Sequence, residues 1–176
     1  MGETRPHRDA GARVTRSIYR DPWRVDITVR DGVVVPMPNS ALARAMTGAL
    51  DAVGATGPAS IGLILSDDRE LAELNEAHMG VRGPTDVLSF PLDPGPGFVL
   101  PPRARPHLGD VVVSVERAID QARSGRGGHT GDVRWSPTDE VKLLVIHGTL
   151  HVCGMDHAEP AEEAVMRALE NRLLAG

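Results

Sequence analysis

The feature that most constrains the fold is the alternation of short apolar runs with longer segments of helical pattern along the chain. Four segments have the length and composition of β-strands: 25–29, 59–65, 87–90 and 107–115. Five segments have helical spacing or helix-boundary residues: 39–53, 67–78, 116–125, 137–154 and 160–175. Interspersed elements of this kind pack as helices against a sheet. We therefore expect an α+β fold (mixed α/β), in which helices pack against a small mixed β-sheet.

The last two expected helices have recognisable ends and faces. Ser136 can cap the helix at 137–154, and Pro137 suits its first position because proline has no N–H to leave unpaired. The final helix carries an apolar set at helical spacing, which we expect to face the core. That set is Val165, Leu169 and Leu173.

The N-terminal 24 residues differ in composition from the rest of the chain. Residues 1–24 hold six arginines and three acidic residues. We expect them to be a flexible basic extension, either an arm that touches nucleic acid or a segment without structure. Structure would then begin at 25–29, and an Asp31-Gly32 turn could join this strand to 33–35 as a hairpin. Residues 25–176 are expected to form a single domain, since a chain of 176 residues suits one hydrophobic core.

Outside the extension the balance of charge is acidic. The net charge of the whole chain is −5 and residues 1–24 carry +3, so the remaining residues carry −8. Such a body binds nucleic acid poorly unless it has a local basic surface or a metal ion. Five arginines in or beside the two long loops could form a basic rim: Arg103, Arg105, Arg123, Arg126 and Arg134.

The composition also bears on the compartment. No apolar run approaches the roughly 20 residues that span a bilayer, so we expect no membrane contact. The N-terminal residues lack the apolar stretch of a secretory signal. Cys153 is the only cysteine, so the chain can form no intrachain disulfide. These features fit a cytoplasmic protein.

Three of the seven histidines lie within eleven residues, in the sequence HGTLHVCGMDH at 147–157. His147 and His151 are four residues apart, so a helix places both rings on one face and both can bind one metal ion. Gly154 allows the chain to leave the helix through a left-handed turn, after which His157 can supply a third nitrogen. Three protein ligands leave one tetrahedral position open, as in catalytic rather than structural zinc sites. We expect Cys153 to be a small buried residue and not a ligand.

The residue that follows His147 excludes one familiar class of enzyme. Zinc peptidases with the H-E-x-x-H pattern use the glutamate as general base, and here that position is Gly148. Asp156 precedes His157 and has two interpretations. It could orient a ring or activate water, or its side chain could cap the end of the helix.

Three motifs together resemble one known family. The sequence H-G-x-L-H-x-x-G-x-D-H at 147–157 looks like the signature of the YbeY family of metal-dependent endoribonucleases. GPTDVLSFP at 83–91 is similar to the second motif of that family, and LGDVVVSVERA at 108–118 is similar to the third. Their order and spacing agree with the family over roughly residues 25–175.

The resemblance implies a single zinc ion held by His147, His151 and His157, on a helix at the centre of the fold. It implies a single-strand-specific endoribonuclease in the cytoplasm, with single-stranded RNA, rRNA and the ribosome as partners, and with no DNA or membrane. The implied roles are maturation of the 3′ end of 16S rRNA and late-stage quality control of the 70S ribosome. Two rival hypotheses are a ribosome-associated binding factor with a mainly structural metal site, and a metal hydrolase of another substrate.

The loop before the second motif contains a departure from the family, and the motif itself contains two residues with open roles. Many family members have an arginine where this chain has Met79, and a positive charge there would suit a phosphate. Arg82 lies in the same loop and is our candidate substrate-binding residue; the alternative is a solvated loop arginine. Asp86 and Ser89 could hydrogen-bond a ligand histidine or the substrate, or could serve turn and strand packing. The catalytic base is unassigned, and hydrolysis and attack by the RNA 2′-OH both stay open.

Overall fold

A computed structural model of the protein describes residues 14–93, 95, 97–125 and 135–176. Its strands are β1 Val14–Arg20, β2 Trp23–Val29, β3 Ala59–Ser66, β4 Val87–Pro91 and β5 His107–Ser114. Its helices are α1 Asn39–Ala52, α2 Asp68–Met79, α3 Val115–Arg123, α4 Pro137–Val152 and α5 Pro160–Ala175. Among these residues, none of the helices is both long enough and apolar enough to cross a membrane.

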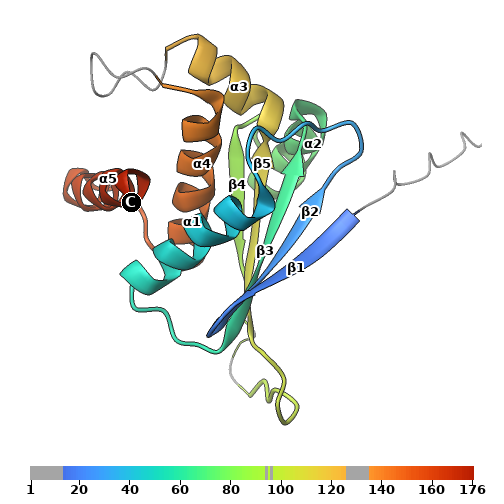
Figure 1. The fold of residues 1–176 in the computed structure, drawn as a ribbon, viewed down its shortest axis with the longest axis vertical. Coiled ribbons are helices and arrows are strands. Elements are labelled where there is room, and N and C mark those ends of the chain that lie inside the picture. The colour runs from blue at the N-terminus through green and yellow to red at the C-terminus, as the bar shows by residue number, and fades with distance from the viewer. Residues whose placement is uncertain (1–13, 94, 96, 126–134) are drawn as a thin grey trace, which may run out of the picture.

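The five strands form one mixed sheet in the order β1-β2-β3-β5-β4. The two central pairings, β2 with β3 and β3 with β5, are parallel, and the two edge strands pair antiparallel. Helices α1, α4 and α5 all lie on one side of this sheet (Figure 1). The expected α+β fold, with helices packed on a small mixed sheet, is therefore confirmed.

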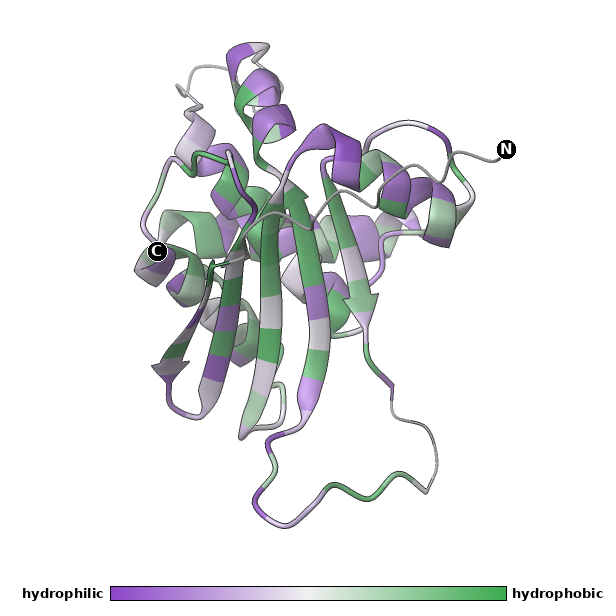
Figure 2. Ribbon diagram, turned by 90° about the vertical axis from the view of Figure 1, so that its right-hand side faces the viewer, coloured by the Kyte–Doolittle hydropathy of each residue, from purple (hydrophilic) through white to green (hydrophobic). Residues whose placement is uncertain are grey.

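The main core lies between the sheet and helices α1 and α4. Alternate residues of the central strands point into it, and their contrast with polar neighbours is visible along the strands in Figure 2. Eight apolar residues of the described strands are fully buried: Val25, Ile27, Ala59, Ile61, Leu63, Leu65, Val111 and Val113. Helix α4 contacts α1, β4 and β5. It is therefore held from several sides, which gives its polar face a fixed position.

The structure moves the expected start of the folded region. Strand β1 pairs along its whole length with β2, so residues 14–24 belong to a β-hairpin and not to a flexible extension. Residues 1–13 lie outside the described part. Strand β1 is mostly exposed and polar, and Ile18 is its only half-buried apolar residue, so its sequence lacks the alternation of a buried strand. The hairpin expected between 25–29 and 33–35 is wrong, because the two edges of β2 are taken by β1 and β3.

The predicted start of α4 is confirmed, whereas the predicted inward face of α5 is partly wrong. Ser136 caps α4 and Pro137 is its first residue, as predicted. In α5, however, Val165 is 61% exposed, and Met166 takes the inward position with 2% exposure. Leu169 and Leu173 pack against the core as expected. The inward face of α5 therefore begins at Met166 in place of Val165, and the other two predicted positions are right.

Candidate metal centre

Helix α4 carries the site, and its N-terminus is fixed by a capping box. The Ser136 side chain accepts a hydrogen bond from the Asp139 backbone N–H, and the Asp139 carboxylate accepts one from the Ser136 backbone N–H. These bonds satisfy donors that a helix start leaves unpaired. The helix then runs for 16 residues to its end beside the histidines. Its start and length place His147 and His151 in its last two turns.

Gly148 allows α4 to lie directly against the sheet. A Cβ at this position would lie 2.4 Å from Val111 Cγ1, 3.1 Å from Val87 Cγ2 and 3.2 Å from Ser89 Oγ. The Ser89 hydroxyl also donates a hydrogen bond of 3.0 Å to the Gly148 carbonyl oxygen. This face of the helix has no room for a glutamate. The general base of the H-E-x-x-H peptidases is thus sterically excluded as well as missing.

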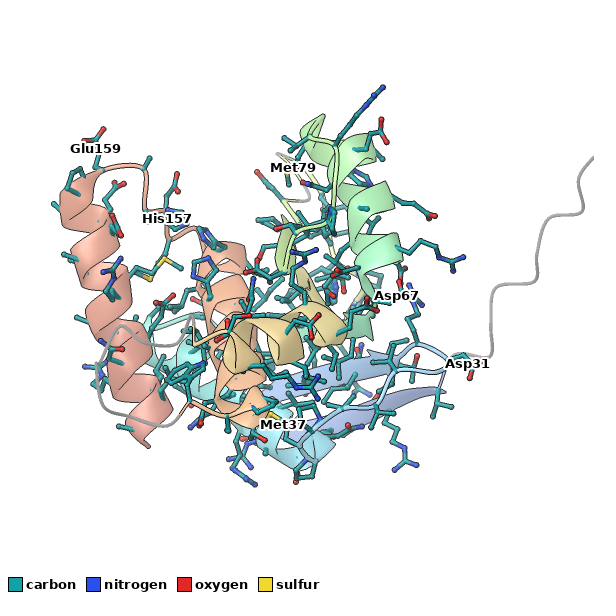
Figure 3. The ribbon with its side chains drawn as sticks, turned by 90° about the horizontal axis from the view of Figure 1, so that it is seen from above. Asp31, Met37, Asp67, Met79, His157 and Glu159 are labelled. Carbon is teal, nitrogen blue, oxygen red and sulfur yellow. The ribbon has the colours of Figure 1, made fainter. Side chains whose placement is uncertain are left out.

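The three histidine rings meet at the C-terminal end of α4. The Nε2 atoms of His147 and His151 are 3.1 Å apart, and ligand nitrogens of all three rings lie within 4.8 Å of one another. Gly154 has a φ of +87°, the left-handed conformation that reverses the chain after the helix. Figure 3 shows His157 on this connection between α4 and α5. The fold thus brings together the three residues predicted as ligands.

The donor set and spacing suit a metal ion. Two nitrogens bound tetrahedrally at roughly 2.0–2.1 Å are about 3.4 Å apart, close to the observed His147–His151 separation. His157 is exposed and follows a glycine turn, so a small inward movement would complete the triangle. Burial, together with the neighbouring His147 and His157, lowers the pKa of His151. A neutral ring keeps the nitrogen lone pair that a metal ligand needs.

Glu170 is a member of the site that the sequence did not reveal. Its Oε1 lies 2.7 Å from Nδ1 of His147, on the side of the ring away from His151. The residue comes from α5, four positions after the buried Met166, so it lies on the inward face of that helix. A glutamate on an inward helix face is a local signal that could have drawn attention to it.

Two hollows flank the triad. A cavity of about 270 Å³ lies between α4 and α5 and is lined on one side by His147 and His157. A more open groove of about 410 Å³ runs on the other side, past His151 and Met79. In Figure 3 His157 and Met79 face the same end of α4 from opposite sides. The open side of the triad is therefore accessible to a ligand from two directions.

Comparison with known proteins agrees with the motifs. The family model described as endoribonuclease YbeY matches residues 34–176. The chain belongs to the YbeY family. Relatives named endoribonuclease YbeY include those of Roseiflexus sp. (39% identical, covering 85% of this chain and 90% of the relative) and Salinispora tropica (46%, covering 72% and 80%). The relative from Thermobifida fusca is 42% identical over 86% of this chain and 92% of its own length. The predicted family and its enzyme class, a nuclease, are confirmed.

The second motif lies beside the triad, but Arg82, which precedes it, does not line the groove. Met79 lines the groove in the place where many family members carry arginine. The Arg82 side chain is 89% exposed and pairs with Glu76 at 3.3 Å. Asp86 lines both hollows, and its carboxylate accepts hydrogen bonds from Gln121 and from the Val87 backbone. Asp86 therefore combines the predicted turn role with a place near the metal centre.

Two further residues of the histidine segment take local roles. Cys153 is half-buried, and burial raises the pKa of its thiol. It is not among the three residues whose donor atoms converge, so the structure agrees with a packing role. The Asp156 carboxylate accepts a 2.7 Å hydrogen bond from the His157 backbone N–H. This bond is local turn chemistry and not a helix cap, because its donor lies five residues beyond the end of α4. It stabilises the turn that returns His157 to the site.

The expected basic rim is not continuous. Arg103 and Arg105 lie in the loop at the lower end of the sheet, whereas Arg123 ends α3 at the upper end (Figure 1). Arg105 donates a hydrogen bond to the Pro22 carbonyl, so it anchors the loop. Arg126 and Arg134 lie outside the described residues. The hypothesis of one rim is wrong for the three described arginines, because Arg103 and Arg105 lie at one end of the sheet and Arg123 lies at the other.

Proposed function

We propose that this YbeY family member is a cytoplasmic endoribonuclease that cuts single-stranded RNA with one zinc ion bound by His147, His151 and His157. The observation that carries the proposal is the convergence of three imidazoles around a point with an open side. Three-histidine sites with an open position are typical of catalytic zinc. The assignment to the 3′ end of 16S rRNA and to 70S ribosome quality control rests on the family resemblance.

In this proposal the protein's own residues form both the zinc site and the two hollows that bind the RNA. A bound zinc ion supplies a Lewis acid and a water molecule whose pKa is near 7. The lowered pKa of His151 favours its neutral ring, and the Glu170 carboxylate holds His147 at Nδ1, the nitrogen away from His151. The two hollows receive the RNA on either side of the triad. The chemical nature of the new RNA ends, a cyclic phosphate or a simple phosphate, distinguishes attack by the 2′-OH from hydrolysis.

The site test compares zinc-loaded wild-type protein with His147→Ala on matched single- and double-stranded RNAs. Cleavage of the single strand alone, lost in His147→Ala, is the expected result. His78→Ala is the matched control, since this exposed histidine packs against Phe90 and lines neither hollow. Tight zinc binding without cleavage of any RNA would instead favour the ribosome-associated binding factor. Zinc-dependent turnover of another ester would favour the general metal hydrolase.

Arg82 is our candidate for phosphate binding. Because its side chain is exposed, it can be replaced without disturbing the packing of the protein. Within the described part of the chain Arg82 forms an ion pair with Glu76, and surface ion pairs contribute little to stability. Arg82→Ala should therefore leave the fold intact and raise the KM for RNA. Met79→Arg, which restores the usual family residue beside the groove, should lower that KM. An unchanged KM in Arg82→Ala would assign the residue to the solvated loop.

A further inference from the structure

Glu170 is placed to determine which nitrogen of His147 faces the metal centre. Its carboxylate is 2.7 Å from Nδ1, and its side chain is only 13% exposed. A carboxylate only accepts hydrogen bonds, so Nδ1 carries the ring proton of neutral His147. The lone pair is then on Nε2, the atom that faces Nε2 of His151 at 3.1 Å. The two contacts of His147 thus agree on one tautomer.

We propose that Glu170 is the positioning residue of this metal centre. It fixes the tautomer and the orientation of His147 and makes the ring a stronger donor, without touching the ion or the RNA. Carboxylates in this position typically change metal affinity by about 10–100-fold. This gives helix α5 a role in metal binding, although it supplies no ligand.

A purely structural role for Glu170 makes different predictions. The bond could serve only to hold α5 against α4, as the 2.9 Å bond from Lys142 to the Leu174 carbonyl does. In that case removing the carboxylate would lower the melting temperature and leave the zinc dissociation constant of the folded protein unchanged. The positioning role requires the opposite pattern, with a weaker zinc site in a protein that is still folded.

The test measures the zinc dissociation constant by competition with a chromogenic chelator. Glu170→Ala should weaken zinc binding about 10–100-fold. Glu170→Gln should fall in between, because the amide oxygen still accepts the hydrogen bond but carries no charge. Glu73→Gln is the matched control, an exposed glutamate on α2.

A second readout follows the tautomer directly. Long-range ¹H–¹⁵N spectra of ¹⁵N-histidine in the metal-free protein should show the Nδ1–H form of His147 in wild type and a mixture in Glu170→Ala. An unchanged zinc affinity, or the same tautomer in both proteins, would overturn the proposal. Neither measurement involves RNA, so the proposed role of Glu170 is tested independently of the proposed ribonuclease activity.

A separate observation concerns the cavity between α4 and α5. Its volume is about 270 Å³, and it opens beside His147 and His157. Its wall includes the buried Leu144 and Met166 and the indole of Trp135. The Trp135 Nε1–H donates a hydrogen bond to Glu140, which fixes the ring on the wall. Apart from the histidines, the charged side chains of the lining are four carboxylates, which repel phosphate, and Arg167, which pairs with Glu163.

We infer that this cavity receives one unpaired nucleobase next to the scissile phosphate, stacked on Trp135; the inference rests on the proposed cleavage of RNA. The apolar part of this wall, with its aromatic ring, suits a flat, uncharged group. The neighbouring triad would hold the phosphate while the base turns into the cavity. A base inside a duplex cannot leave its stack without losing its pairing. The cavity would therefore account for a preference for single strands.

The test is an abasic scan of a single-stranded RNA with zinc-loaded wild-type protein. Removing the base at one position beside the cleavage site should lower kcat/KM by about 5–150-fold, the equivalent of about 1–3 kcal/mol for base stacking. Trp135→Leu should cause a similar loss on intact RNA and almost none on the abasic RNA. Equal tolerance at every position, or fully additive losses, would refute the inference.

A direct binding measurement separates this inference from the activity itself. Trp23, the other tryptophan, is 3% exposed in the core, so a change in fluorescence on adding nucleosides reports Trp135. Saturable quenching by nucleosides but not by ribose 5-phosphate supports a base site. Equal quenching by both would contradict it. The fluorescence measurement needs no RNA cleavage. A protein that binds nucleosides but cleaves no RNA would therefore contradict the proposed function and not the base site.

Discussion

Gly148→Ala is the most informative single substitution in α4. The added methyl would lie 2.4 Å from Val111 Cγ1, far inside the 3.5–4.0 Å optimum for two carbon atoms. Val111 is fully buried and β-branched, so it cannot turn aside easily. Overpacking typically costs about 1–3 kcal/mol, and this contact belongs at the upper end. Alanine in a helix recovers about 1 kcal/mol relative to glycine.

The expected net loss is about 2 kcal/mol, which lowers the melting temperature by about 4–8 °C in a chain of this size. Thermal unfolding of the metal-free protein measures it. Gly48→Ala in α1 is the matched control, because its Cβ would meet only Leu173 Cδ2, at an ordinary 3.8 Å. That variant should gain about 1 kcal/mol from helix propensity alone.

The displaced helix should also weaken the zinc site, since two of its ligands lie within three residues of Gly148. A Gly148→Ala/Val111→Ala double variant should lose less stability than the two single losses added together, because the clashing methyl is absent. A Gly148→Ala protein that is as stable as Gly48→Ala would refute this account of the helix–sheet contact.

Three further outcomes follow from the structure. Asp110 raises the pKa of His107 through a 3.1 Å hydrogen bond. The stabilisation of the fold by this pair is therefore complete below about pH 6.5 and is lost as the pH rises through the raised pKa of His107. Urea unfolding of Asp110→Asn should therefore show a larger deficit from wild type at pH 5.5 than at pH 8.5. Ser89→Ala removes the bond to the Gly148 carbonyl and should cost about 0.5–1.5 kcal/mol in the same assay. Zinc at 100 times its dissociation constant should stabilise the protein by about 2.7 kcal/mol, and His147→Ala should abolish the shift in melting temperature; a shift that persists would place the ion elsewhere.

The part of the site that could be predicted is the part fixed by local geometry. The spacing of His147, His151 and Gly154 determines directions along one helix and its end, so the sequence alone indicates the triad. Glu170 could not be found in this way, because its distance from His147 depends on how α5 docks on α4. The position of Arg82 depends similarly on a loop conformation that no periodicity describes.

The fold shows the same division between local and long-range information. Strand β3 and helix α4 are buried on most sides, and their apolar patterns are strong enough to be recognised in isolation. Strand β1 is an edge strand whose side chains are mostly exposed, so only its pairing with β2 makes it a strand. Residues 33–35 have the composition of a strand but find no free sheet edge beside β2.

The slight burial of α5 has a consequence for the motions of the protein. Met166 is the only buried residue of this helix, so α5 should open locally at a lower free energy than α4 does. The hydrogen bond that His147 donates to Glu170 joins that loosely held helix to the metal centre. Loading the ion should therefore slow amide hydrogen exchange along α5, and removing it should let the helix open more often while the sheet stays closed.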